Sequence, residues 1–73
     1  METTEEILKK LRERIEGHRK CASSCEAERR FWAERGNSFL AEAWKCMADW
    51  HRKQIEENAK RLEEVNKEKE NDK

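Results

Sequence analysis

Apolar and small residues recur along this chain in alternating steps of three and four, in two runs separated by one short break. The first run extends from Leu8 to Trp32 and the second from Ala41 to Val65. A repeat averaging about 3.5 residues places its members on one stripe of an α-helix. The break is the tetrapeptide RGNS at positions 35–38, and the chain has no proline and only two glycines. The pattern therefore predicts two long helices joined by a tight turn.

Local signals set the ends of the predicted helices. Thr3 followed three residues later by Glu6 has the spacing of a capping box at the start of the first helix. Gly36 suits the left-handed residue that follows a helix, and Asn37 or Ser38 can cap the second helix. The expected ranges within a single domain, 1–73, are a first helix over about 4–35, a turn at 36–37, a second helix over about 38–68 and a frayed polar tail at 69–73.

These elements predict an all-α, two-helix antiparallel hairpin. Pairing through the turn aligns residues whose numbers sum to about 73, so aliphatic residues meet near the termini and small residues meet large ones near the turn. Gly17 lies inside the first helix and marks a weak or closely packed point. Asn58 occupies a seam position where a polar residue can fix the register. The predicted seam includes Leu8, Leu11, Ile15, Cys25, Trp44, His51, Ile55, Asn58, Leu62 and Val65.

The stretch FLAEAWKCMADWH, residues 39–51, carries more apolar surface than one neighbouring helix can cover. On a helical wheel its apolar arc is roughly 220° wide, whereas a helix packing on one neighbour shows little more than about 100°. The first helix offers a path of small residues, Gly17, Cys21 and Ser24. We therefore expect self-association, most simply as a dimeric four-helix bundle. The predicted oligomer or partner interface comprises Phe31, Trp32, Phe39, Leu40, Ala43, Cys46, Met47 and Trp50.

This surface favours a small, non-enzymatic protein-interaction or regulatory module. The expected partners are a second copy of the chain and a host or cellular protein. In size and charge-rich composition the chain resembles the small helical-hairpin accessory proteins of temperate phages and plasmids. That resemblance implies a regulatory protein that acts by occupying a partner surface.

Composition and motifs argue against several other classes. The 17 basic and 17 acidic residues balance, so overall attraction to an anionic membrane is weak. No apolar run approaches the ~20 residues of a membrane span, and the N-terminus METTEEILKK lacks the pattern of a secretory signal. We therefore expect a cytoplasmic protein. No catalytic triad, phosphate loop or carboxylate pair is recognisable, so we expect no enzyme activity and no cofactor.

Two cysteines and two histidines form the chain's candidate metal ligands. His18, Cys21, Cys25 and His51 carry the donor atoms that Zn²⁺ prefers. Their spacing, H-x2-C-x3-C with a distant histidine, matches no standard zinc pattern. We therefore predict no metal site, with the cysteines acting as small hydrophobic residues and the histidines as polar seam residues.

An alternative function is RNA or DNA binding. The hairpin layout is similar to that of the plasmid RNA-regulating hairpin dimers, which read RNA loop pairs from a helix face. That resemblance implies a basic surface on the first helix, formed by Arg19, Lys20, Arg29 and Arg30. Acidic residues are interleaved with these bases, which favours a solvated helix face and makes nucleic acid the less favoured partner.

Overall fold

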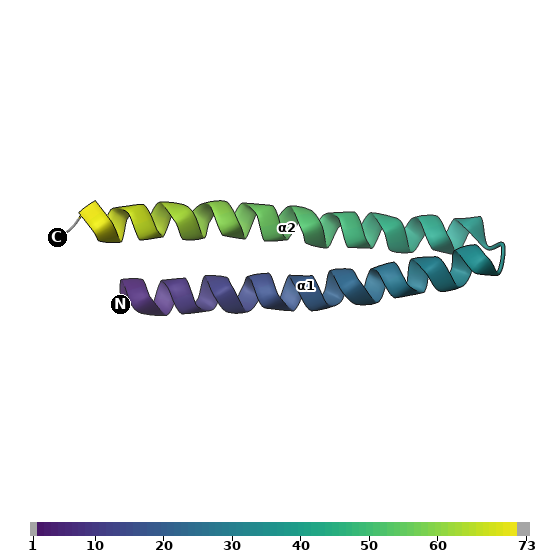
Figure 1. Cartoon of the computed structure of the whole chain (residues 1–73), viewed down its shortest axis with the longest axis horizontal. Helices are drawn as coiled ribbons and strands as arrows, with labels where there is room; N and C mark the ends of the chain where they lie inside the picture. Colours follow the sequence, from purple (N-terminus) through teal and green to yellow (C-terminus); the bar gives the residue numbers. More distant parts are fainter. Residues whose placement is uncertain (1, 72–73) are drawn as a thin grey trace.

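The computed structural model describes residues 2–71 of the chain. Two α-helices, α1 (Thr4–Glu34) and α2 (Ser38–Asn71), run antiparallel and side by side, joined by a tight turn (Figure 1). Both ends of the chain lie at the same end of a rod with principal extents of 57 × 16 × 15 Å. The predicted all-α, two-helix fold is confirmed.

The predicted cap of α1 is present. The Glu6 backbone N–H donates to Thr3 Oγ1 at 3.2 Å, which satisfies one of the free donors at the helix start. The Thr3 hydroxyl in turn donates to the Glu6 carboxylate at 3.2 Å. In a capping box the carboxylate would accept from the Thr3 backbone N–H, so only half of the motif is formed.

The turn between the helices closes α1 with a Schellman motif. Asn37 N–H donates to the Trp32 carbonyl at 2.9 Å, and Gly36 N–H donates to the Ala33 carbonyl at 3.1 Å. Gly36 has φ +76°, the left-handed conformation that favours glycine. The Asn37 side chain then accepts from Leu40 N–H at 3.0 Å and caps α2. The predicted roles of Gly36 and Asn37 are confirmed.

The C-terminal end of α2 lies beyond its predicted position. The helix continues to Asn71, three residues past the expected end at 68, whereas α1 ends at Glu34, one residue early. Lys69 forms an ion pair with Glu5 of α1, and Lys67 lies 3.6 Å from Glu63 on the same helix. These pairs, and a lysine near a helix C-terminus, stabilise the last turns. Residues 72 and 73 of the predicted tail lie outside the described part of the chain.

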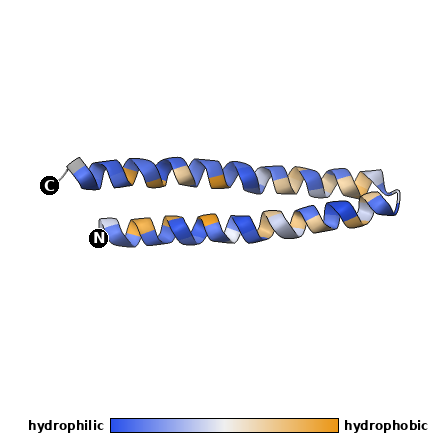
Figure 2. Ribbon diagram, viewed as in Figure 1, coloured by the Kyte–Doolittle hydropathy of each residue, from blue (hydrophilic) through white to orange (hydrophobic). Residues whose placement is uncertain are grey.

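The core follows the predicted seam, all of whose members are buried or half-buried. It has two different halves. Away from the turn, Leu8 and Leu11 are almost fully buried and Ile15 lies beside them. Towards the turn, the buried side chains are only the small ones of Ala22, Cys25 and Ala48. The strongest hydrophobic colours accordingly lie in the half of the rod away from the turn (Figure 2).

The structure differs from the prediction at two positions, Gly17 and Asn58. α1 runs unbroken through Gly17, which is exposed, and a Cβ built there would meet nothing within 4 Å. Gly17 is therefore an open point of the hairpin rather than a closely packed one. Asn58 is half-buried, but its amide donates to the Gln54 carbonyl of its own helix at 2.8 Å. That bond does not fix the register between the two helices.

Candidate interaction face and histidine contact

The hairpin has two different long faces, and a salt bridge identifies one of them. Arg52 Nη2 of α2 lies 2.7 Å from the Glu26 carboxylate of α1. Glu26 also accepts from Arg29, and Arg52 also pairs with Asp49, at 3.0 Å each. We call this side, formed by Glu26, Arg29, Asp49 and Arg52, the charged face.

Glu26 is the centre of the charged face. Hydrogen bonds from Arg52 and Arg29 lower the pKa of the Glu26 carboxyl, against the opposing effect of partial desolvation. The same hydrogen bond from Arg52 to Glu26 raises the pKa of Arg52. The network joins α1 to α2 across the side of the hairpin and holds four charged groups in one geometry.

The opposite side carries the apolar residues that the seam does not use. Residues two apart on a helix point roughly 200° away from each other, so the side chains two positions from Glu26 and Arg52 face away from the charged network. Trp50 confirms this placement for α2, because its ring contacts His18 of α1. We call this side the aromatic face. Its members are Gly17, Cys21, Ser24 and Phe31 on α1, and Leu40, Ala43, Met47 and Trp50 on α2.

The aromatic face is open to solvent in the hairpin. Trp50 is 55% exposed, Met47 48% and Phe31 42%, while Leu40 is half-buried at the edge of the seam. Gly17, Cys21 and Ser24 are all exposed and form a low strip on α1. Large side chains on α2 therefore lie beside small side chains on α1, across one face of the rod.

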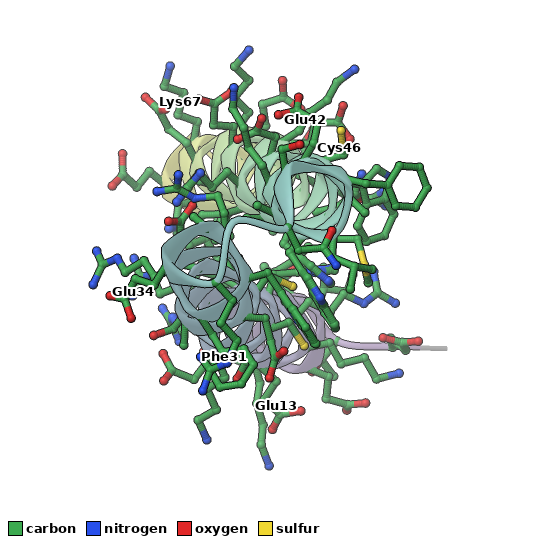
Figure 3. All side chains as sticks on the ribbon, turned by 90° about the vertical axis from the view of Figure 1, so that its right-hand side faces the viewer. Glu13, Phe31, Glu34, Glu42, Cys46 and Lys67 are labelled. Atoms are coloured by element: carbon green, nitrogen blue, oxygen red, sulfur yellow. The ribbon has the colours of Figure 1, made fainter. Side chains whose placement is uncertain are left out.

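The residues of the predicted interface do not all lie on the aromatic face. Phe39 is 81% exposed and, like Cys46, lies close to the back of α2. In Figure 3, Cys46 points up and away from α1, whereas Phe31 points down and away from α2. One flat partner surface cannot cover both. The helical wheel gives the full width of the apolar arc of α2. A partner that packs alongside both helices contacts only the part of this arc that lies next to α1.

The two aromatic residues at the end of α1 also contact each other. The Phe31 and Trp32 rings meet edge to face at a centroid distance of 5.0 Å. The Arg35 guanidinium lies 3.5 Å from the Phe31 ring centroid, a cation–π contact. Trp32 is half-buried, and its indole N–H donates to Glu28 at 3.3 Å. Trp32 therefore belongs to the seam and supports Phe31 at the border of the aromatic face.

A direct contact between the two histidines also joins the helices, within the seam itself. His18 Nδ1 and His51 Nδ1 are 2.8 Å apart, and both residues are half-buried. The Trp50 ring stands edge-on to both imidazoles, at centroid distances of 5.7 Å from His18 and 5.0 Å from His51. The predicted alignment set His18 beside Ile55. The sequence brings both histidines near each other on facing seams, and the structure adds the direct contact between their Nδ1 atoms.

The cysteines and the basic residues show no comparable grouping. All three cysteines are free thiols, with Cys25 buried and Cys21 and Cys46 exposed. No group of three or more His, Cys, Asp or Glu side chains among the described residues could hold a metal ion. Of the bases proposed for nucleic acid, Arg29 is bound to Glu26, Arg19 lies 4.0 Å from Glu16, and Lys20 and Arg30 are exposed.

The fold and these faces define the class of protein as a two-helix α-hairpin with one charged and one aromatic face. Neither described helix has a stretch apolar enough to cross a membrane. Comparisons with protein-family models, curated protein sequences and solved structures find no match to this chain.

Proposed function

We propose that this chain is a small, non-enzymatic interaction module that self-associates through its aromatic face. Two hairpins related by a two-fold axis would form a four-helix bundle. The observation that carries the proposal is the exposure of Met47 and Trp50 beside the small residues Gly17, Cys21 and Ser24. Two copies of such a face are complementary, because the large side chains of one can pack on the low strip of the other.

The composition of the hairpin core supports the same proposal. Near the turn the hairpin buries only Ala22, Cys25 and Ala48, while larger apolar side chains stay in water. Chains of this size bury too little surface for high stability and are commonly completed by oligomerisation. Met47 and Trp50 are each about half-exposed, so burial of the exposed part would add roughly 0.7–1.5 kcal/mol for each side chain in each copy, half the value for a fully exposed one.

The assembly determines which surface of the chain is free to bind and regulate a partner protein. A dimer with the aromatic face buried exposes the charged faces of both copies, which are then the surfaces free to bind a host or cellular protein. A monomer would instead offer the aromatic face itself to that partner. The resemblance to phage and plasmid accessory proteins fits either arrangement.

Subunit exchange between labelled chains tests the proposal. Cys46 is exposed and lies off the aromatic face, so it can carry a donor or an acceptor dye in a Cys21→Ser background, with Cys25 protected by burial. We expect energy transfer on mixing and its loss when unlabelled chain is added in excess.

Matched variants of α2 locate the contact. Met47→Glu and Lys45→Glu place the same residue at exposed positions two apart, on the aromatic face and on the opposite side respectively. We expect Met47→Glu to abolish energy transfer with helicity retained, and Lys45→Glu to leave it intact. Equal effects of the two variants, or no transfer in the parent, would contradict the proposal.

A further inference from the structure

The two histidines of the seam contact each other directly through their Nδ1 atoms. They come from different helices, with their Nδ1 atoms 2.8 Å apart and their ring planes inclined by 44°. A direct hydrogen bond between them needs one protonated and one unprotonated Nδ1. The same unprotonated nitrogen is the atom with which a neutral imidazole binds a metal ion.

We propose that His18 and His51 form a two-histidine site for a divalent transition-metal ion that prefers imidazole, such as Ni²⁺, Cu²⁺ or Zn²⁺. Bonds of about 2.0–2.1 Å at an angle of about 90° place two adjacent ligand nitrogens about 2.9 Å apart, and a tetrahedral angle places them about 3.4 Å apart. The observed separation of 2.8 Å is close to the first value. The two nitrogens point at each other in the hairpin, and a turn of each ring by about 45° would direct both towards one shared ion with a right angle at the metal.

The surroundings leave room for the rest of the coordination shell. Both imidazoles are half-buried, so one side of the pair is accessible to water. Trp50 stands edge-on to both rings and covers another side with an apolar surface. No carboxylate of the described residues is hydrogen-bonded to either ring, so neither nitrogen is committed to an acidic partner. Among residues 2–71 no third ligand is grouped with the pair, so water molecules would complete the shell.

Cys21 is the one further side chain whose contribution the test must separate. It is exposed on α1, one turn after His18, and a thiolate is a strong ligand for Zn²⁺. Cys25 is buried within the seam two turns from His18. Ni²⁺ is therefore the preferred probe, since imidazole suits it and it does not oxidise thiols.

A metal ion bound by both histidines would cross-link α1 and α2 near the middle of the rod. The unfolded chain offers the same two imidazoles 33 positions apart in sequence, without a fixed geometry. An ion that binds the folded hairpin more tightly raises its stability with increasing metal concentration. Such a clamp lies at the point where the well-filled half of the core gives way to the half built from small residues.

Thermal unfolding of the reduced 73-residue chain tests this site. The melting temperature is followed by circular dichroism at about pH 7.5, with Ni²⁺ from zero to about 1 mM and with Mg²⁺ as the control ion. We expect the melting temperature to rise with the logarithm of the Ni²⁺ concentration and to be insensitive to Mg²⁺. His18→Gln and His51→Gln should each remove the Ni²⁺ effect, while Cys21→Ser should keep it.

A second readout covers the case in which a histidine variant does not fold. Trp50 touches both imidazoles, so bound Ni²⁺ or Cu²⁺ should quench its fluorescence, and Trp50→Phe should remove most of the quenching. The proposal is overturned if Ni²⁺ leaves both the melting temperature and the fluorescence of the parent unchanged. It is equally overturned if the Ni²⁺ effect persists in the folded His18→Gln and His51→Gln variants, or disappears in Cys21→Ser.

Discussion

Substitution of Gly17 by alanine should stabilise the hairpin. Gly17 lies near the middle of α1, in an unbroken helix that continues on both sides of it. A Cβ at this position meets nothing within 4 Å, so the methyl group fits without any rearrangement. The backbone conformation is one that alanine adopts readily, and alanine has less freedom to lose from the unfolded chain.

The expected gain is about 1 kcal/mol, the usual difference between glycine and alanine in a helix interior. For a domain of this size, that free energy corresponds to a rise of about 4–8 °C in melting temperature. Thermal unfolding followed by circular dichroism measures the shift. Ala27→Gly is the matched control, because Ala27 is exposed on the same helix and its replacement should lower the melting temperature by a similar amount.

The melting temperature should be measured at the lowest usable protein concentration, where self-association affects the stability of the hairpin least. Gly17 lies on the aromatic face, so a partner that packs closely there would meet the added methyl group. If Gly17→Ala leaves the hairpin unchanged or less stable at low concentration, the reasoning from the open helix position is wrong. A gain at low concentration that shrinks at high concentration would place Gly17 within the dimer contact.

Three further predictions concern the turn, the charged face and the thiols. Gly36→Ala should destabilise the hairpin by about 1–2 kcal/mol, measured by urea unfolding, because Gly36 has φ +76° and a Cβ opposes that conformation; unchanged stability would argue against the left-handed turn. The pKa of Glu26 is lowered by Arg52 and Arg29, so the folded chain loses this proton more readily than the unfolded chain does. The resulting stability is present above the ordinary glutamate pKa of about 4.3 and is lost as pH falls through the lower folded value. The urea midpoint should therefore fall as the pH is lowered through and below the ordinary glutamate pKa, and fall less in Arg52→Gln; equal slopes would refute this role for Glu26. In thiol labelling, Cys46 should react quickly at every protein concentration, Cys25 only on unfolding, and Cys21 more slowly as association covers it; fast labelling of Cys25 in the folded state would contradict its burial.

The fold was predictable because the sequence signals are local and agree with one another. The two runs of apolar and small residues set the seam, and Gly36 and Asn37 mark the one break. The polarity of the last residues of α2 predicts an earlier end of the helix than the structure shows, because the ion pair between Lys69 and Glu5 depends on the packed hairpin. A single sequence shows which residues are charged, but it does not show which opposite charge lies across the seam.

The candidate site was predictable only in part. Composition indicated excess apolar surface on α2, and Met47 and Trp50 are indeed exposed. The helical wheel already places Phe39 and Cys46 almost opposite the seam, but which part of the apolar arc borders α1 depends on the packed hairpin. The contact between His18 and His51 lies one helical turn from the predicted pairing. A wheel gives the direction of each side chain, whereas the reach of a ring along the seam depends on the three-dimensional packing.

The mass of the reduced parent chain in solution, measured by light scattering over a wide concentration range, tests the central claim most directly. Burial of the aromatic face between two copies predicts twice the mass of one chain at the upper concentrations, with a fall towards a single chain on dilution. A mass of one chain at every concentration, with the helices intact, would contradict self-association through Met47 and Trp50.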